Sequence, residues 1–263
     1  MKIGFIGLGN MASAMVGGLI KSKVKKTDII GFDVMEAART KASKDMGITI
    51  AKSNTEVAKA ADYIVVAVKP QFVVPVLEEI NASLTDKKVV ISIVAGKSLE
   101  FLGTYITNTK KIVRCMPNTA ALVGAAITGV TPTDKVNKTE LKTALSIIES
   151  FGKASVVSEK LMDAVTGVSG SAPAFVFMFI EAMADAAVLE GMPRAQAYEF
   201  AANAVYGSAK LMIDTGKHPG ELKDMVCSPA GTTIAAVRVL EEAGFRGTVI
   251  DAVEAAAERS KEL

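Results

Sequence analysis

Short runs of consecutive apolar residues alternate with amphipathic segments through the first half of the chain. The runs are rich in Val and Ile, and the segments between them repeat apolar residues at helical spacing. Continuous apolar strands that alternate with amphipathic helices predict a parallel sheet covered on both faces. The predicted strands are 2–6, 28–32, 63–68, 89–93 and 111–115, and the predicted helices are 11–21, 36–46, 54–60, 71–82 and 98–106. Two further strands, 125–130 and 154–157, bracket a helix over 140–150 and complete the α/β domain.

Strand patterns stop near residue 158, and the rest of the chain predicts helices only. Gly191 and Gly216 stand where helices are expected to end, and Pro193 suits a first turn. We therefore predict an α/β domain over 1–157 and an all-helical domain over 158–263. The helices are Ala-rich and apolar on more than one face, so subunits are expected to interlock through them. The predicted helices are 159–167, 173–191, 193–215, 218–226, 233–243 and 247–262.

The first strand leads straight into a glycine turn and a helix, with the sequence Gly7-Leu8-Gly9-Asn10-Met11-Ala12. Gly7 permits a tight turn, Gly9 lets the backbone approach phosphates, and a small third residue lets helix and strand pack closely. The unpaired N–H groups of the new helix would face the anion. The strand, turn and helix together predict a Rossmann-type site for a dinucleotide, with an ordinary glycine turn as the alternative.

The residue types after the second strand bear on which dinucleotide binds. Asp33 stands about where an acidic residue binds the adenine ribose hydroxyl, which favours NAD. Arg39 and Lys41 follow it and could neutralise a 2′-phosphate, although a solvated helix face is the simpler interpretation. The sequence leaves the choice open.

A dinucleotide is expected to bind in a crevice at the carboxyl ends of the parallel strands. Three more loops should reach this crevice, because each follows the carboxyl end of a strand. Lys69 would bring an ammonium group, small residues around Ala95 would admit a flat ring, and Asn118 could bond a carboxamide. Each loop alone is typical of an ordinary connection, but the three together predict a binding site. The loops are Ala67-Val68-Lys69-Pro70-Gln71, Ile93-Val94-Ala95-Gly96 and Arg114-Cys115-Met116-Pro117-Asn118-Thr119.

The helical half carries a second candidate site in the run Ser228-Pro229-Ala230-Gly231-Thr232-Thr233. Small residues before a helix leave backbone N–H groups open to a carboxylate, and the two threonines add hydroxyl groups. Simple N-capping by Ser or Thr is the alternative. Gly170-Ser171-Ala172-Pro173 predicts a second helix start of this kind. The two starts together predict a pocket for a small anion.

Composition and charge narrow the class of protein. The 263 residues carry 30 basic and 28 acidic side chains without a basic block, so nucleic acid is not an expected partner. Cys115 and Cys227 lie far apart with no Cys or His at metal spacing, which predicts no metal site and free thiols in a reducing cytoplasm. No signal peptide is expected at the start of the chain. The apolar stretch 172–189 contains Glu181 and Asp185, which favours a buried or interface helix over a membrane span.

The chain offers few groups for strong acid–base catalysis. His218 is its only histidine and stands in an expected turn between helices, where a capping role is typical; 161–209 contains no Lys. A hydroxy-acid dehydrogenase needs such a group, usually His or Lys. A substrate that brings its own proton fits better, and a cyclic iminium is one.

Six motifs, the glycine turn among them, together resemble pyrroline-5-carboxylate reductases over essentially the whole chain. The resemblance implies reduction of 1-pyrroline-5-carboxylate to L-proline, the last step of proline biosynthesis, with NADPH or NADH. It also implies a Rossmann domain, a helical dimerisation domain with the substrate site at the homodimer interface, and further assembly into decamers in many members. The motifs are Ala-Val-Lys-Pro-Gln, Arg-Cys-Met-Pro-Asn-Thr, Ser-Gly-Ser-Ala-Pro-Ala-Phe, His-Pro-Gly-Glu-Leu-Lys-Asp, Ser-Pro-Ala-Gly-Thr-Thr and the turn's own Gly-Leu-Gly-Asn-Met-Ala.

The resemblance also implies roles for individual residues. The substrate carboxylate would bind the backbone of the loop from Ser228 to Thr233, and Thr233 would meet the ring nitrogen as hydrogen-bond partner and proton donor. The family usually has Gly at Ala230, where a positive φ would be strained. It also usually has Gly at Ala172 and Tyr at Phe175. The implied cofactor contacts are Asn10, Met11, Asn54, Lys69, Pro70, Ala95 and Asn118, beside Gly7, Gly9, Asp33, Ala67 and Val68 from the crevice pattern.

Members of the family usually prefer NADPH, and this resemblance outweighs the indication from Asp33, so NADPH is the expected cofactor and NADH the alternative. Two other functions remain open from the sequence. One is reduction of a different cyclic imino acid, such as a six-membered ring, and the other is a non-catalytic NAD(P)-binding regulatory protein.

Overall fold

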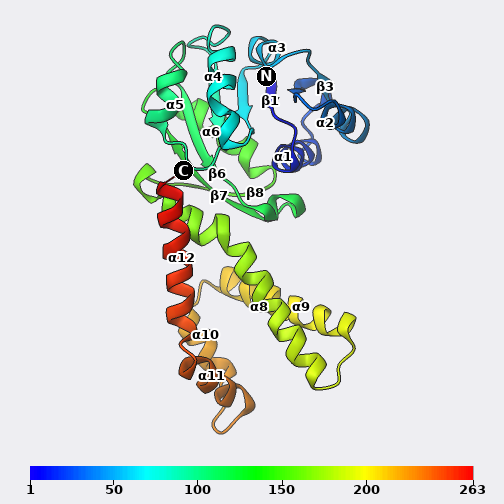
Figure 1. Ribbon diagram of the computed structural model, residues 1–263, viewed down its shortest axis with the longest axis vertical. Helices are drawn as coiled ribbons and strands as arrows, with labels where there is room; N and C mark the ends of the chain where they lie inside the picture. Colours follow the sequence, from blue (N-terminus) through cyan, green and yellow to red (C-terminus); the bar gives the residue numbers. More distant parts are fainter. Residues whose placement is uncertain (263) are drawn as a thin grey trace. The chain divides into compact units, whose positions relative to one another are not determined.

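The computed structural model describes residues 1–262 and contains an eight-stranded sheet in the N-terminal half of the chain (Figure 1). The strand order is β3-β2-β1-β4-β5-β6-β7-β8. The chain therefore reverses its direction of winding between β1 and β4, which is where parallel α/β sheets bind ligands. The strands are β1 Ile3–Ile6, β2 Ile29–Phe32, β3 Thr49–Ile50, β4 Tyr63–Val66, β5 Val89–Ser92, β6 Ile112–Met116, β7 Ala126–Pro132 and β8 Gly152–Val156.

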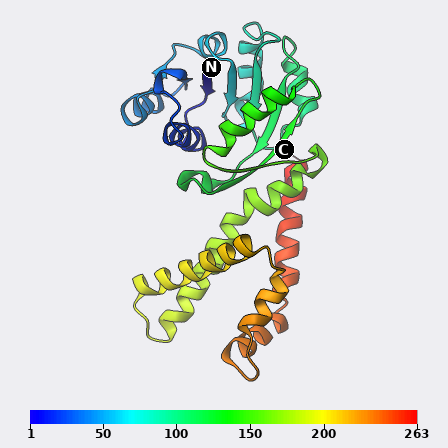
Figure 2. The ribbon, with the colours of Figure 1, turned by 180° about the vertical axis from the view of Figure 1, so that it is seen from behind.

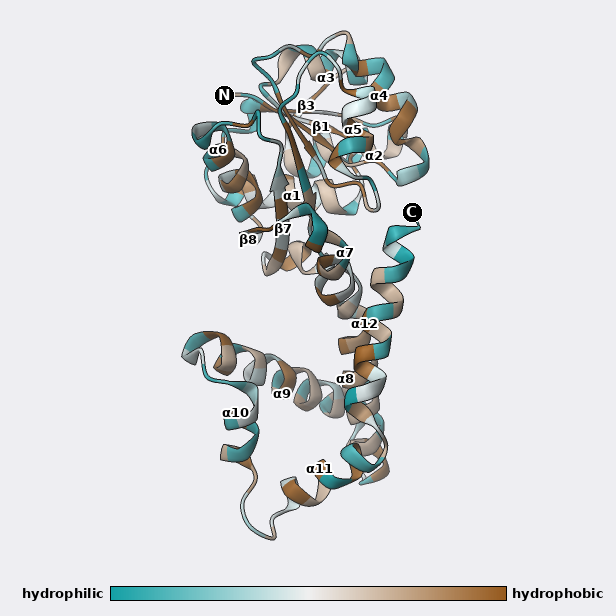
Figure 3. Ribbon diagram, turned by 90° about the vertical axis from the view of Figure 1, so that its left-hand side faces the viewer, coloured by the Kyte–Doolittle hydropathy of each residue, from teal (hydrophilic) through white to brown (hydrophobic). Residues whose placement is uncertain are grey.

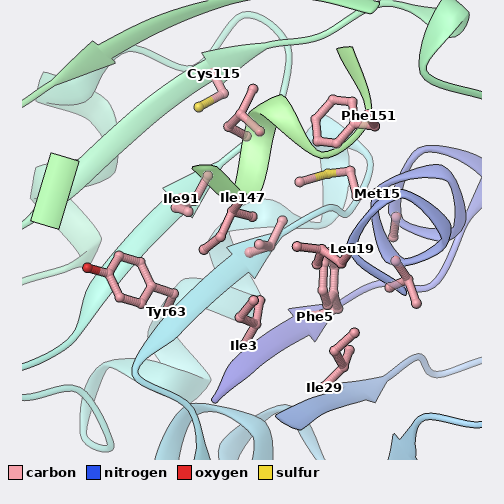
Figure 4. Close-up of a cluster of buried hydrophobic side chains, with 14 of the residues drawn as sticks. Ile3, Phe5, Met15, Leu19, Ile29, Tyr63, Ile91, Cys115, Ile147 and Phe151 are labelled. Atoms are coloured by element: carbon pink, nitrogen blue, oxygen red, sulfur yellow. The ribbon is translucent and has the colours of Figure 1, made fainter. Parts of the chain in front are cut away.

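Apolar side chains on both faces of the sheet build two separate cores, because successive strand residues point to opposite faces. Ile3 and Phe5 pack with α1 and α6, as the close-up in Figure 4 shows for α1. Ile6 and Ile64 pack on the other face with α3, α4 and α5. Figure 2 shows α6 lying across its face of the sheet. The helices are α1 Asn10–Lys21, α2 Glu36–Lys41, α3 Asn54–Ala60, α4 Val73–Asn81, α5 Leu99–Tyr105 and α6 Lys138–Glu149.

The predicted Rossmann-type parallel sheet is confirmed, with two differences of detail. The ladder between β6 and β7 is antiparallel, while the other ladders are parallel. A single 3-10 helix, Thr119–Val123, joins β6 to β7, and so short a connection suits an antiparallel neighbour. The sequence pattern also missed β3, whose two residues are too few to show alternation.

Contacts divide the described chain into two compact units. The first comprises Met1–Ser171 together with the end of the chain from Ala255, and the second comprises Ala172–Glu254. In the first unit, the buried Ser260 hydroxyl donates to Asp163 Oδ1 at 2.8 Å. The end of the last helix is therefore fixed to α7, Met162–Val165, in the same unit.

The second unit is helical and has little core of its own. Its buried apolar cluster consists of Ala184, Ala197 and Ala201, all small. Large side chains such as Phe177 and Leu189 are exposed, and hydrophobic turns are visible along its helices in Figure 3. The helical run Glu159–Leu189 is long and apolar enough to cross a membrane by length and composition alone. The helices are α8 Ala172–Leu189, α9 Arg194–Thr215, α10 Pro219–Val226, α11 Thr232–Glu242 and α12 Phe245–Lys261, whose last turns belong to the first unit.

Candidate dinucleotide and substrate sites

The glycine turn after β1 requires glycine at its first position. Gly7 has φ +91°, and its N–H donates to Phe32 O at 2.8 Å. A Cβ on Gly7 would lie 2.6 Å from Ala67 O, closer than any real contact. The turn therefore depends on Gly7 both for its backbone conformation and for the close passage of the loop after β4.

The start of α1 provides an open cradle of backbone N–H groups. Gly9 is the N-cap residue, and no side chain caps the helix. A Cβ built on Gly9 meets nothing within 4 Å, so the backbone there is open to a close-fitting group. Asn10 and Met11, the first two residues of α1, present N–H groups at the positive end of the helix dipole. This cradle fits a dinucleotide pyrophosphate.

The loops predicted to share one crevice do end at one edge of the sheet. Ala67 N donates to Ile6 O at 2.8 Å, and Ile93 N donates to Val66 O at 3.1 Å, so the strands leave the ladder side by side. Strand β6 continues the parallel set beside β5. The structure thus brings Ala67, Val68, Lys69 and Pro70 to the same edge as Gly7, Gly9, Ala95 and Asn118.

Asn118 at this edge has an acceptor without a partner. Its Oδ1 atom is buried and forms no hydrogen bond within residues 1–262. A buried amide oxygen that lacks a donor is uncommon in a native fold. The predicted partner, a carboxamide N–H, would satisfy it.

Asp33 and Asn54 are both held by the protein itself. The Asp33 carboxylate accepts hydrogen bonds from Leu8 N and Met35 N, each at 2.8 Å. The buried Asn54 side chain donates from Nδ2 to Glu79 Oε2 at 2.7 Å. Asp33 therefore lies beside the glycine turn as the sequence predicts, whereas the Asn54 amide nitrogen is occupied by Glu79.

Sequence reasoning missed a supporting network beneath the crevice loops. Arg114, 8% exposed, pairs with Glu159 at 3.0 Å between Nη1 and Oε1. The same Glu159 oxygen accepts from Leu99 N at 2.6 Å. The network fixes the middle of β6 and the start of α5 to the residues that precede α7. Its members are 45 and 60 residues apart, so no local signal indicates them.

The loop before α11 leaves a helix N-terminus open. Gly231 is the N-cap residue, and no side chain caps the helix, so the alternative of simple Ser or Thr capping is wrong. The Gly231 N–H donates to Ser228 O at 3.1 Å and closes the turn. Thr232 and Thr233 are the first residues of α11, and their N–H groups remain for an anion.

Ala230 adopts the positive φ that the sequence analysis identified as a strain. Its φ is +56°, in the left-handed region that glycine tolerates and alanine does not favour. Only Lys23 shares this property among the non-glycine residues of the described chain. The loop before α11 therefore keeps the shape of a glycine turn at an energetic cost.

The second predicted helix start is wrong. Thr166–Ser171 is a π-helical segment that continues directly into α8, so Ser171 lies inside a helical run that begins at Glu159. Pro173 has no N–H and misled the sequence analysis, because proline usually marks a first turn. Here the widened π turn precedes it, and single π turns often occur at functional sites.

Two other reactive side chains are accounted for structurally. The His218 Nδ1 atom accepts from Gly220 N at 3.1 Å and caps α10, which confirms its predicted capping role. Burial raises the pKa of the Cys115 thiol far above its ordinary value, so this sulfur is not a nucleophile at neutral pH. Within residues 1–262, no cluster of three His, Cys, Asp or Glu side chains is arranged to hold a metal.

Two family models match the chain. Residues 159–263 match pyrroline-5-carboxylate reductase dimerisation, and residues 2–96 match NADP oxidoreductase coenzyme F420-dependent. The first match covers the helical half, where the structure exposes its apolar side chains. The second covers the glycine turn and the strands on both sides of it.

Full-length relatives agree with these matches. The chain is 53% identical to the pyrroline-5-carboxylate reductase of Escherichia coli over 263 residues, which is 100% of this chain and 98% of the relative. A solved pyrroline-5-carboxylate reductase from Coxiella burnetii superposes with a TM-score of 0.93 at 33% identity, covering 99% of this chain and 97% of that one. The solved Plasmodium falciparum pyrroline carboxylate reductase with NADP bound gives a TM-score of 0.90 at 35% identity, covering 100% and 97%.

Proposed function

The chain belongs to the pyrroline-5-carboxylate reductase family, and from that premise we propose that it reduces 1-pyrroline-5-carboxylate to L-proline. It is an NAD(P)H-dependent oxidoreductase that acts on the C=N bond of a cyclic imino acid. The observation that carries this conclusion is the 53% identity to the Escherichia coli enzyme over the whole chain. The uncapped N-termini of α1 and α11 supply two anion sites. A dinucleotide requires one of them, and an amino-acid carboxylate requires the other.

The residues of the sheet edge would hold the nicotinamide dinucleotide, which supplies the hydride when bound. Gly7, Gly9, Asn10 and Met11 form the cradle for its pyrophosphate, since the N–H groups at the start of α1 lack partners. The orphaned Oδ1 of Asn118 would accept from its carboxamide. Ala67, Val68, Lys69, Pro70 and Ala95 would line the crevice at the neighbouring strand ends, with Asp33 beside the turn and Asn54 at the start of α3.

The loop before α11 would hold the substrate. The backbone N–H groups of Thr232 and Thr233 bind the carboxylate, and Ser228, Ala230 and Gly231 shape the turn that aims them. The Thr233 hydroxyl is the hydrogen-bond partner of the ring nitrogen: it accepts from the iminium N–H, and it can donate to the amine nitrogen that the reduction leaves. Hydride adds to the imine carbon while the nitrogen is already protonated, so this step needs no strong acid. Ser171, in the π turn before α8, is assigned to the substrate side by the resemblance alone.

The proposal also covers the oligomeric state of the protein and its cellular compartment. The dimerisation-family match supports an oligomer, and we propose a homodimer formed by the helical domain of residues 158–263, with residues 1–157 as the dinucleotide domain. The exposed apolar side chains of α8 and α9 support this interface. We also propose that the dimers assemble further to a decamer and that the protein is cytoplasmic. It would have neither membrane nor nucleic-acid partners. Cys115 and Cys227 are free thiols, in keeping with a reducing compartment.

A pair of substitutions at one position tests the substrate site. Thr233→Ala should lower kcat by about 100-fold or more, because the hydrogen-bond partner of the ring nitrogen is lost. Thr233→Ser keeps a hydroxyl and should recover most of the rate. Nucleotide affinity, measured by the fluorescence of bound NADPH, should change little in either variant. Unchanged turnover in Thr233→Ala would remove Thr233 from the mechanism.

A further inference from the structure

The supports of two crevice loops meet at one carboxylate oxygen. The loop after β5 ends at Leu99, the first residue of α5, and Leu99 N donates to Glu159 Oε1 at 2.6 Å. Arg114, two residues before the end of β6, donates from Nη1 to the same oxygen at 3.0 Å. Glu159 therefore joins the end of the loop that contains Ala95 to the strand that leads into Asn118.

The loop between β5 and α5 is attached at both of its ends. At its start, Ile93 N donates to Val66 O at 3.1 Å, so the neighbouring strand holds it. At its end, Leu99 N is one of the first N–H groups of α5, and such groups have no acceptor inside their own helix. Glu159 supplies that acceptor, and its negative charge suits the positive end of the helix dipole. Loss of the bond would leave the loop attached to the sheet at its start only.

Arg114 fixes the carboxylate that holds this loop. The Arg114 side chain is buried, and in the parallel ladder it lies beside Ser92, the last residue of β5. A buried guanidinium requires a counter-charge. Among residues 1–262, Glu159 is the acidic side chain that forms an ion pair with it. The sheet therefore positions the carboxylate, and the carboxylate positions the start of α5.

We propose that Glu159 is a positioning residue, which holds the loop containing Ala95 in place relative to Asn118 and so aligns the nicotinamide end of the crevice for hydride transfer. The inference rests on the proposed function for the identity of the reaction. A misplacement of about 1 Å at a reacting group can cost about 100-fold in rate. The pyrophosphate cradle at the start of α1 shares no element with this network, so dinucleotide affinity should depend little on Glu159.

Two substitutions of Leu99 isolate the hydrogen bond to Glu159. Leu99→Pro removes the N–H at the first helical position, which suits proline, and Ser98 before it already has the extended backbone that proline requires. Leu99→Ala loses the same side chain but keeps the N–H, so it is the matched control. We expect kcat with NADPH to be lower by about tenfold or more in Leu99→Pro than in Leu99→Ala. The Kd of NADPH without substrate should agree within about threefold between the two variants.

Substitutions of Glu159 test the acceptor. Glu159→Ala should lower kcat by about tenfold or more, whereas Glu159→Gln keeps an oxygen for Leu99 N and Arg114 and should restore kcat to within about threefold. Ser260→Ala is the control for stability, because it breaks a buried hydrogen bond to Asp163 in the same helical run and touches neither loop. Its kcat should not change. A similar loss of kcat in Ser260→Ala, or equal kcat in Leu99→Pro and Leu99→Ala, would overturn the proposal.

The emission spectrum of bound NADPH reports on the same loop without any reaction, because nicotinamide fluorescence depends on the surroundings of the ring. At saturation, the emission should shift toward that of free NADPH in Leu99→Pro and in Glu159→Ala, and it should not shift in Leu99→Ala. These shifts in a protein that forms no proline would contradict the proposed function and leave the positioning role of Glu159 standing. Unchanged emission and unchanged kcat in an enzyme that forms proline would overturn the positioning role alone.

Discussion

The two compact units of this chain obtain their stability in different ways. The first buries complete apolar cores on both faces of a sheet, with Phe5, Met15 and Phe151 fully inside. The second buries only three alanines, and it leaves large side chains such as Phe177 exposed. Burial of apolar area is the main favourable term in folding, so the first unit can be stable alone while the second requires a partner surface. The comparison indicates that cofactor binding and substrate binding depend on assembly to different degrees.

The largest expected effect comes from a charge placed on the exposed apolar helices. Phe177→Asp should disrupt the oligomer and reduce turnover by about 100-fold or more, because a buried unpaired carboxylate is very costly at an apolar interface. Nucleotide affinity should remain within a few-fold, since the first unit has its own core. Thr85→Asp adds the same charge at an exposed loop position and should change neither property. Sedimentation velocity measures the oligomeric state, and nucleotide titration measures the affinity. A Phe177→Asp variant that remains a fully active oligomer would contradict the contrast between the two units.

The next largest effects come from the two glycines of the turn after β1, where Gly7 is needed for folding and Gly9 for dinucleotide binding. Gly7→Ala should destabilise the protein by more than about 2 kcal/mol, because a Cβ meets Ala67 O and φ is positive. Gly9→Ala should leave the free energy of unfolding within about 1 kcal/mol, since its Cβ meets nothing and its φ is −70°. It should nevertheless weaken dinucleotide binding by about tenfold or more, because the methyl group enters the phosphate cradle. Urea unfolding at fixed protein concentration, together with nucleotide titration, tests the pair. Equal stability of the two variants would refute this account of the turn.

The smallest effect concerns backbone strain in the second unit. Ala230→Gly should raise the free energy of unfolding by about 0.5–1 kcal/mol, since removal of the left-handed penalty exceeds the added chain entropy. Lys23→Gly is the matched control in the first unit, because Lys23 also has a positive φ. Thermal unfolding of both variants at one protein concentration provides the measurement. A gain in Lys23→Gly without one in Ala230→Gly would indicate that the loop before α11 is not strained.

Local patterns in the sequence predicted most of the fold and the open helix start after β1. Apolar runs identified the strands, and the glycine turn predicted the cradle at Gly9, because both signals lie within a few residues. Contacts between distant segments could not be predicted in this way. The Glu159 network is one such case, and the commitment of Asn54 to Glu79 is another. The π turn before Ser171 was also missed, since Gly, Ser and Pro suggest a helix start whether or not one occurs.

The central claim is that this enzyme reduces 1-pyrroline-5-carboxylate with a nicotinamide cofactor. The most direct test follows the loss of absorbance of NADH and of NADPH when 1-pyrroline-5-carboxylate is added to the purified full-length protein, with proline identified as product. The account predicts rapid oxidation of the nicotinamide cofactor with stoichiometric formation of proline. A folded protein that binds both nucleotides but forms no proline with either would contradict it.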